Sequence, residues 1–276
     1  MSNYIDAHSH VWTPDTERYP LAPGFTKEQM QPPSFTPEEL FAQCRPEGVR
    51  RVVLIQMSYY RFDNRYMLDM MRKHPGTFGG VGMVDWTAPK PDVEMLRLAK
   101  QGVRGFRVPS GNEPAENWME TESFDRMFRC AADHRLAICP LMNPRGLPSL
   151  SRMCAKHLKT RVVIDHLCRI GIDGEIRDAD VHALCMMAHF PEVRVKVSAF
   201  YALGKKKPPH DDLLPLIRTV YDAFGARRLM WASDSPFQGV DSTYRASISL
   251  IRDRCAWLTD RDREWLLRKT AAQVFF

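Results

Sequence analysis

Two histidines close to the amino terminus have a spacing that indicates a role in chemistry rather than in ordinary core packing. Asp6, His8 and His10 alternate along the segment Ile5–His10. Side chains alternate across a β-strand, so an extended segment would place all three on one face. Paired imidazoles there could bind a metal ion or polarise a carbonyl group, and the structural alternative is a hydrogen-bonded pair in the core. At the carboxyl end of a barrel strand, the chemical interpretation is favoured.

An aspartate ends an apolar run near the other end of the chain. Asp234 closes the segment Leu229–Asp234, directly before Ser235-Pro236. A carboxylate at the end of an apolar strand can act as a general base, whereas Asp before Ser-Pro can also cap a turn. We expect Asp234 to face the paired histidines.

A third histidine follows another apolar run. His166 comes after Val162 and Ile164, with which we expect it to share a face, so that it enters the same mouth. Asp165 would then point outward and make a structural hydrogen bond.

Three further side chains could bind substrate or stabilise the site. Arg107 ends a short run and could bind a carboxylate through two hydrogen bonds, or form an ion pair inside the barrel. Lys196 and Ser198 share a face of a later run. For Lys196 a salt bridge to Asp6 or Asp234 is favoured over a role as base or Schiff-base former.

Eight short runs rich in β-branched residues must position these groups, and each is followed by a helical pattern. Near-continuous apolar strands of this kind are typical of a parallel sheet covered by helices. Helix signals recur between them: Thr36 and Glu39 can form a capping box, and Asp63, Ser123 and Asp178 can begin helices. The sequence therefore predicts an α/β fold, a (β/α)8 TIM barrel in which residues 1–276 form a single domain. The predicted strands are Tyr4–His10, Arg51–Ser58, Phe78–Val84, Val103–Val108, Leu136–Leu141, Arg161–His166, Val193–Ser198 and Arg228–Asp234.

Two long loops fall where a barrel places its active site. Val11–Phe35 contains five prolines and follows the first strand, and Leu203–Asp212 follows the seventh. Long connections without regular structure are usually functional, and both should lie on the carboxyl-terminal face.

Composition excludes several classes of protein. With 276 residues, 44% hydrophobic and 26% charged, the chain is typical of an ordinary globular protein. The net charge of +6 is scattered, with Lys205–Lys207 its densest run, so we expect no nucleic-acid partner. No apolar run is long enough to predict a membrane span. Seven cysteines without a CxxC pair, and no leader pattern, predict a cytoplasmic protein without disulfides.

Motifs at both ends resemble those of the amidohydrolase-related family. They are Asp6-Ala7-His8-Ser9-His10 and Ala232-Ser233-Asp234-Ser235-Pro236, joined by Gly105-Phe106-Arg107, Asp165-His166 and Lys196-Val197-Ser198. Within that family the chain is most similar to the barrel lactonases, which act on 2-pyrone-4,6-dicarboxylate or on sugar lactones. The resemblance covers nearly the whole chain.

The resemblance implies roles for individual residues. Asp234 matches the general base that activates water, and His8, His10 and His166 match histidines around the scissile carbonyl. Arg107 matches a substrate-binding position, and Arg61, Lys196, Ser198 and Arg169 are further candidates for substrate binding. After His166, relatives often continue Leu-Gly-x-Pro, whereas this chain has Leu167-Cys168-Arg169-Ile170. Arg107, Arg169 and the Lys205–Lys207 loop would make the mouth positive, which suits an anionic substrate.

The motifs supply only part of the ligand set of the metal-dependent relatives. Metal-dependent relatives add a histidine after the fifth strand, but Ile138–Asn143 contains none. His8, His10 and Asp234 could still hold one zinc or other divalent ion together with water. We favour a site with no obligatory cofactor, either metal-independent or weakly metal-binding.

These patterns predict a hydrolase that opens a lactone or related ester of a small molecule, which we expect to carry a carboxylate. One alternative is a zinc-dependent decarboxylase of an aromatic or unsaturated acid, and another is an inactive barrel that binds a carboxylate. The partner is a small molecule, and the sequence leaves a homo-oligomer open.

Overall fold

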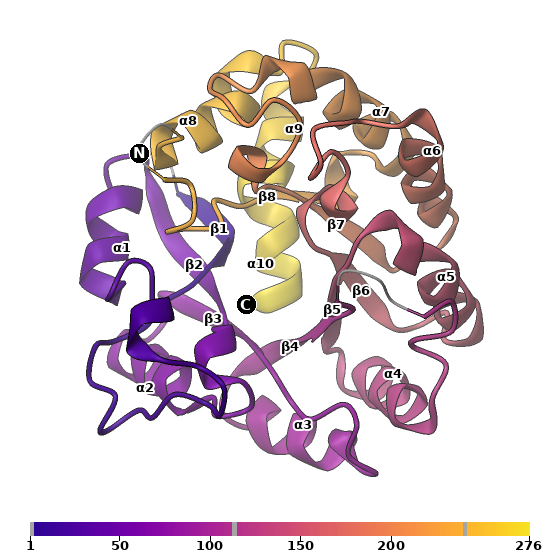
Figure 1. Cartoon of the computed structure of the whole chain (residues 1–276). Helices are drawn as coiled ribbons and strands as arrows, with labels where there is room; N and C mark the ends of the chain where they lie inside the picture. Colours follow the sequence, from indigo (N-terminus) through magenta and orange to yellow (C-terminus); the bar gives the residue numbers. More distant parts are fainter. Residues whose placement is uncertain (1–2, 112–114, 240–241) are drawn as a thin grey trace.

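Eight parallel strands form one sheet whose spatial order follows the sequence (Figure 1). The structure, a computed structural model, describes residues 3–111, 115–239 and 242–276. The first and last strands meet: the amide of Asp234 donates to the His8 carbonyl at 2.8 Å, and the amide of His10 donates to the Ser235 carbonyl at 3.0 Å. The predicted (β/α)8 barrel is confirmed. Its strands are β1 (Tyr4–Ser9), β2 (Val49–Ile55), β3 (Phe78–Gly82), β4 (Val103–Pro109), β5 (Ala137–Leu141), β6 (Arg161–Ile164), β7 (Val193–Val197) and β8 (Leu229–Trp231).

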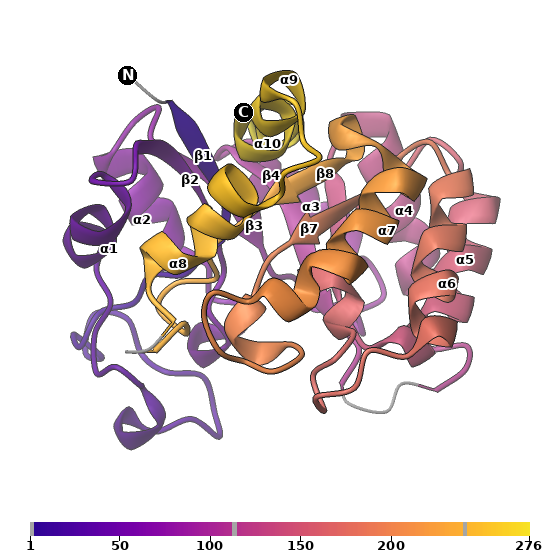
Figure 2. The same cartoon turned by 90° about the horizontal axis from the view of Figure 1, so that it is seen from above.

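Helices surround the strands and cover the outside of the barrel (Figures 1 and 2). The capping box predicted for α1 is present, because Thr36 accepts from the Glu39 amide and Glu39 accepts from the Thr36 amide. For α4 the predicted capping residue, Ser123, was wrong. The helix begins earlier than predicted and is capped by Thr121, whereas the Ser123 hydroxyl donates to the Ala88 carbonyl at 2.9 Å. The helices are α1 (Pro37–Cys44), α2 (Arg65–Lys73), α3 (Pro91–Ala99), α4 (Glu122–His134), α5 (Leu147–Lys156), α6 (Asp178–Met186), α7 (Leu214–Phe224), α8 (Tyr244–Ser249), α9 (Asp260–Glu264) and α10 (Thr270–Phe275).

The last helix, α10, packs into the amino-terminal end of the barrel, and Figure 1 shows it behind the ring of strands. A Cβ atom at Gly79 would lie 2.9 Å from the Phe275 carbonyl oxygen, and one at Gly105 would lie 3.2 Å from its ring. These two glycines therefore allow the close approach of the helix. Hydrophobic side chains fill this end, and the polar groups lie towards the carboxyl ends of the strands.

The long loop after β1 packs against the mouth of the barrel. Trp12 and Phe35 exchange backbone hydrogen bonds of 2.8 and 3.1 Å, which close the loop. The ring of Trp12 also stacks on Phe237, with centroids 5.8 Å apart. Since Phe237 lines the pocket described below, this loop supports one of its walls.

The structure agrees with two further expectations from composition. All seven cysteines are free thiols. Within the described ranges, the helices are too short or too polar to cross a membrane.

Candidate active site

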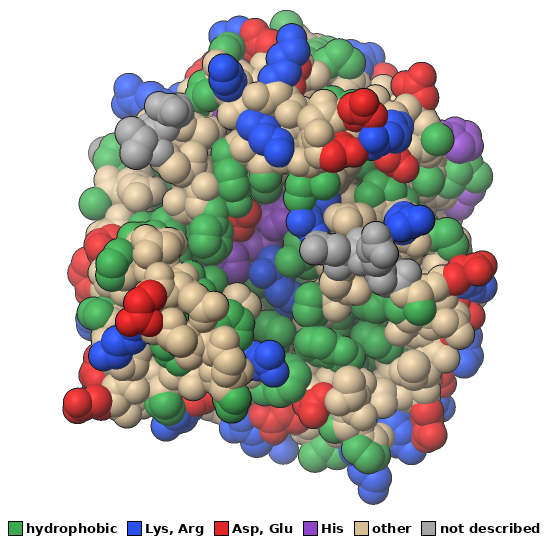
Figure 3. Space-filling model, in the orientation of Figure 1, with side chains coloured by type: hydrophobic (Ala, Val, Ile, Leu, Met, Phe, Trp, Pro, Cys, Tyr) green, Lys and Arg blue, Asp and Glu red, His purple; other side chains and the backbone are tan. Residues whose placement is uncertain are grey.

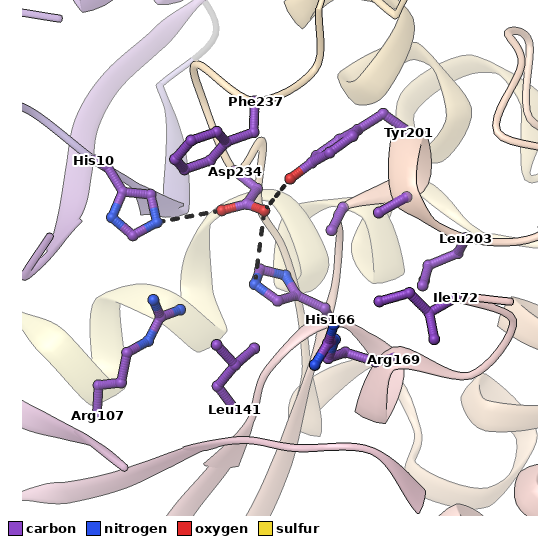
Figure 4. A pocket seen from close by; sticks show the side chains of 12 residues that line it. His10, Arg107, Leu141, His166, Arg169, Ile172, Tyr201, Leu203, Asp234 and Phe237 are labelled. Atoms are coloured by element: carbon purple, nitrogen blue, oxygen red, sulfur yellow. Dashed lines mark hydrogen bonds and ion pairs between the residues drawn. The ribbon is translucent and has the colours of Figure 1, made fainter. Parts of the chain in front are cut away.

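A pocket of about 250 Å³ lies at the mouth of the barrel. Figure 3 shows the hollow in the middle of this face, with histidine and basic side chains at its base. Figure 4 shows how the lining side chains converge. Its polar lining residues are His10, Arg107, His166, Arg169, Tyr201 and Asp234, and its apolar ones include Leu141, Ile172, Leu203 and Phe237.

Asp234 meets the paired histidines, as the sequence predicted. Its Oδ1 lies 3.3 Å from Nε2 of His8 and 3.4 Å from Nε2 of His10. The two imidazole nitrogens are 3.3 Å apart. His10 lines the pocket, whereas His8 is completely buried behind the lining residues.

Asp6 does not share the face of the two histidines, so that part of the strand prediction was wrong. Pairing in β1 is irregular between Asp6 and Ser9, which breaks the strict alternation of side chains. Asp6 accepts a hydrogen bond of 2.9 Å from the hydroxyl of Tyr244 in the outer helix α8. His8 points into the barrel instead, towards Asp234.

Asp6 nevertheless links the two segments that carry His8 and Asp234. Its Oδ1 accepts from the His8 amide at 3.1 Å and from the Ser233 amide at 2.9 Å, and its Oδ2 accepts from the Ser233 hydroxyl at 2.5 Å. Burial raises the pKa of Asp6 to about 6, although these hydrogen bonds oppose the shift. The carboxylate thus fixes the backbone beside His8 and beside Asp234.

Asp165 points into the barrel, which corrects the prediction that it faces outward. It belongs to the same face as Val163, which packs in the inner core, whereas Val162 and Ile164 pack against the helices. Its carboxylate pairs with Lys196 Nζ at 2.9 Å and with Arg107 Nη2 at 3.1 Å. The salt bridge expected for Lys196 is therefore present, but its partner is Asp165 rather than Asp6 or Asp234.

Arg107 and Lys196 also flank the imidazole of His8. Arg107 Nη2 lies 2.8 Å from Nε2, and Lys196 Nζ lies 3.2 Å from Nδ1. Lys196 is completely buried, so it supports His8 and Asp165 and does not line the pocket.

His166 reaches the pocket through a backbone turn and not through strand alternation. β6 ends at Ile164, and the four residues His166–Arg169 all have positive φ angles. Nδ1 of His166 lies 2.9 Å from the Ser198 hydroxyl, and Nε2 lies 3.7 Å from Oδ2 of Asp234. Ser198 is buried and orients His166 rather than lining the pocket.

Tyr201 is a site residue that the sequence did not reveal. It belongs to a short 3-10 helix, Phe200–Ala202, that follows β7, and its hydroxyl donates to Oδ2 of Asp234 at 2.7 Å. Burial and the neighbouring Asp234 carboxylate raise the pKa of Tyr201, so the phenol stays protonated. Only its position in a loop after a barrel strand could have suggested a role.

The charges at the centre follow from these contacts. Burial alone would raise the pKa of Asp234, but His166, His8 and His10 together lower it below its usual value. Burial lowers the pKa of each of these three histidines. At neutral pH the site therefore contains a carboxylate surrounded by neutral imidazoles, with nitrogen lone pairs available.

The two remaining arginine candidates differ in location. Arg169 lines the pocket, is partly buried and forms no ion pair with any described residue. Burial lowers the pKa of its guanidinium. Arg61 is exposed, with its guanidinium 5.9 Å from the ring centre of Phe25, and the structure does not bring it to the pocket.

The donor atoms of His8, His10 and Asp234 fit a single metal ion. Their separations of 3.3, 3.3 and 3.4 Å match the edge of roughly 3.3 Å in a tetrahedron with metal–ligand distances of ~2.0–2.1 Å. Nδ1 of His10 lies 3.0 Å from the Ile55 carbonyl oxygen, a contact that leaves Nε2 free as a ligand. β5 contributes no histidine, as the sequence shows.

Comparison with known proteins agrees with this arrangement. Residues 5–276 match the amidohydrolase family. The chain belongs to the amidohydrolase family. The resemblance inferred from its motifs is thereby confirmed.

Relatives within the family include lactone hydrolases. An L-fucono-1,5-lactonase from Burkholderia ambifaria is 30% identical over 240 residues, which cover 86% of this chain and 81% of that protein. A 4-sulfomuconolactone hydrolase from Hydrogenophaga intermedia is 24% identical, covering 85% and 75% of the two chains. A solved amidohydrolase from Burkholderia multivorans, with bound zinc, superposes with a TM-score of 0.80 at 22% identity and 99% coverage of both chains. The similarity to this solved structure shows that the two proteins share the same fold.

Proposed function

We propose that this protein hydrolyses a lactone that carries a carboxylate group. The observation that carries the proposal is the meeting of Asp234 with His8, His10 and His166 at a pocket. A carboxylate among neutral imidazoles can accept a proton from water, and the lactonases among the relatives perform this class of reaction.

Asp234 acts as the general base in the proposed reaction. It accepts a proton from water while the water oxygen attacks the lactone carbonyl carbon. When the tetrahedral intermediate collapses, the ring C–O bond breaks and the protonated Asp234 returns the proton to the leaving alkoxide. Tyr201 holds Oδ2 of the carboxylate in place throughout.

The positive charge of the Arg107 guanidinium stabilises the oxyanion that forms on the carbonyl oxygen. Arg107 and His10 line the pocket beside Asp234. A fixed guanidinium is an effective partner for a developing negative charge in a partly dry site. His8, held by Arg107 and Lys196, keeps the surrounding side chains in position.

A metal ion held by His8, His10 and Asp234 would polarise the carbonyl and acidify a water molecule. The proposed reaction does not require it, because Arg107 already supplies a positive charge within 2.8 Å of His8 Nε2.

Arg169 binds the carboxylate of the substrate in this proposal. Its guanidinium faces the pocket without an ion-pair partner among the described residues, whereas Arg107 is paired with Asp165. Leu141, Ile172 and Leu203 give part of the pocket lining an apolar character that suits an unsaturated or aliphatic ring.

The test is a panel of carboxylated lactones, their methyl esters and aromatic carboxylic acids, assayed with metal-free and zinc-loaded protein. Ring opening adds one water, and in heavy-oxygen water the label enters the new carboxylate. Release of carbon dioxide would instead support the decarboxylase alternative. Tight binding of the carboxylates without turnover would favour an inactive binding barrel.

A further inference from the structure

The Nε2 lone pair of His8 could be taken either by Arg107 or by a metal ion. Nε2 of His8 is a corner of the triangle that fits a metal ion, and the same atom lies 2.8 Å from Nη2 of Arg107. A ring nitrogen of imidazole offers a single in-plane lone pair, which cannot accept a hydrogen bond and bind a metal at the same time.

We propose that Arg107 and a divalent metal ion exclude one another at His8, so that Arg107 sets the metal affinity of this protein. In one state the guanidinium occupies the lone pair of Nε2, and in the other the ion occupies it and Arg107 has withdrawn. This inference goes beyond the proposed function and does not depend on it, because metal binding is measured directly.

Distance and charge both make the two states exclusive. A zinc ion would bind the Nε2 lone pair at ~2.0–2.1 Å, and Nη2 of Arg107 now lies only 2.8 Å from the same atom, which leaves no room for both. A guanidinium that stayed beside the ion would also repel it in this buried site.

Arg107 is held in a way that allows it to withdraw. Its contacts with His8 and with Asp165 are both made through Nη2, and its Nε has no hydrogen-bond partner among the residues that the structure describes. Asp165 keeps its 2.9 Å ion pair with Lys196 when the arginine moves. The pocket beside Arg107 provides space for the displaced guanidinium.

Metal titration of matched variants tests the proposal. Zinc affinity is measured by competition with a chromogenic chelator, and cobalt absorption bands report coordination. Arg107→Met removes the competitor and should bind zinc at least about tenfold more tightly than wild type. Arg169→Met removes an equal charge from the same pocket without a contact to His8, and its affinity should stay within about threefold.

Two results of the titration would overturn the proposal. Unchanged or absent zinc binding in Arg107→Met would show that Arg107 does not compete. Equal tightening in both variants would show a general charge effect.

Crystal structures of the wild-type protein with and without zinc supply a test that needs no substitution. We expect Arg107 to leave hydrogen-bond distance of His8 Nε2 when zinc is bound. Zinc on His8 with Arg107 still bonded to Nε2 would refute the exclusion, whatever the stability of the variants.

Discussion

The hydroxyl of Tyr201 donates to Oδ2 of Asp234 at 2.7 Å, whereas Oδ1 of the same carboxylate faces Nε2 of His10 (Figure 4) and Nε2 of His8. The two oxygens of the proposed base therefore have different partners. Oδ2 is fixed by a protonated phenol, and Oδ1 is directed at the imidazoles of His8 and His10, where a water or a metal ion would bind.

Tyr201→Phe should lower kcat by roughly 10–150-fold, because it removes the hydrogen bond that positions the charged base, and such a bond contributes ~1.5–3 kcal/mol. KM should change little. Since a donor to a carboxylate lowers its pKa, the acid limb of the kcat profile should also move to higher pH. Circular dichroism and the pH profile are measured together. A fall in activity with an unmoved acid limb would assign Tyr201 a structural role only.

Asp234→Asn should lower kcat by roughly 10²–10⁴-fold while leaving the fold intact, because the amide cannot accept the proton of water. Single-turnover kinetics on the substrate identified by the lactone panel provide the measurement. Asp222→Asn, an exposed carboxylate on α7, serves as the matched control. Near wild-type turnover in Asp234→Asn would remove this residue from the mechanism.

Arg169→Gln should raise KM for carboxylated lactones by about tenfold or more, with a smaller effect on kcat. KM for the uncharged methyl esters should change little, because they lack the carboxylate that Arg169 binds. Arg97→Gln on the exposed face of α3 controls for loss of a positive charge. An equal change in KM for acids and esters would contradict the carboxylate assignment.

Asp6→Asn should change the dependence of stability on pH. The pKa of Asp6 is raised from 3.8 to about 6, so the folded protein binds this proton more tightly than the unfolded chain does. The stability of the wild type relative to the variant should therefore be highest at low pH. It should fall by up to about 3 kcal/mol as pH rises through the interval between these pKa values.

Urea denaturation of both proteins at several pH values across that interval provides the check. Asn also loses hydrogen bonds from Ser233, His8 or Tyr244, which lowers stability at every pH and appears as a constant offset. A difference in stability that does not vary with pH would contradict the raised pKa.

The sequence by itself determined the barrel and the principal chemical groups. Alternating strand and helix patterns predict eight units, because the periods of 2.0 and 3.6 residues are local properties of the chain. The position of His10 and Asp234 at the ends of runs then places them at one mouth, since parallel strands all end at the same face.

The tertiary structure decided which side chains face one another. Irregular pairing in β1 separates Asp6 from His8, so strict period-two alternation gave the wrong face for Asp6. In β6 the alternation continues from Val163 to Asp165, but left-handed backbone carries His166 into the pocket as well, so the face of Asp165 inferred from His166 was wrong. Tyr201 joins Asp234 across 33 residues, and Arg107 joins His8 across 99. Such contacts depend on barrel closure and loop conformation, which no local sequence pattern encodes.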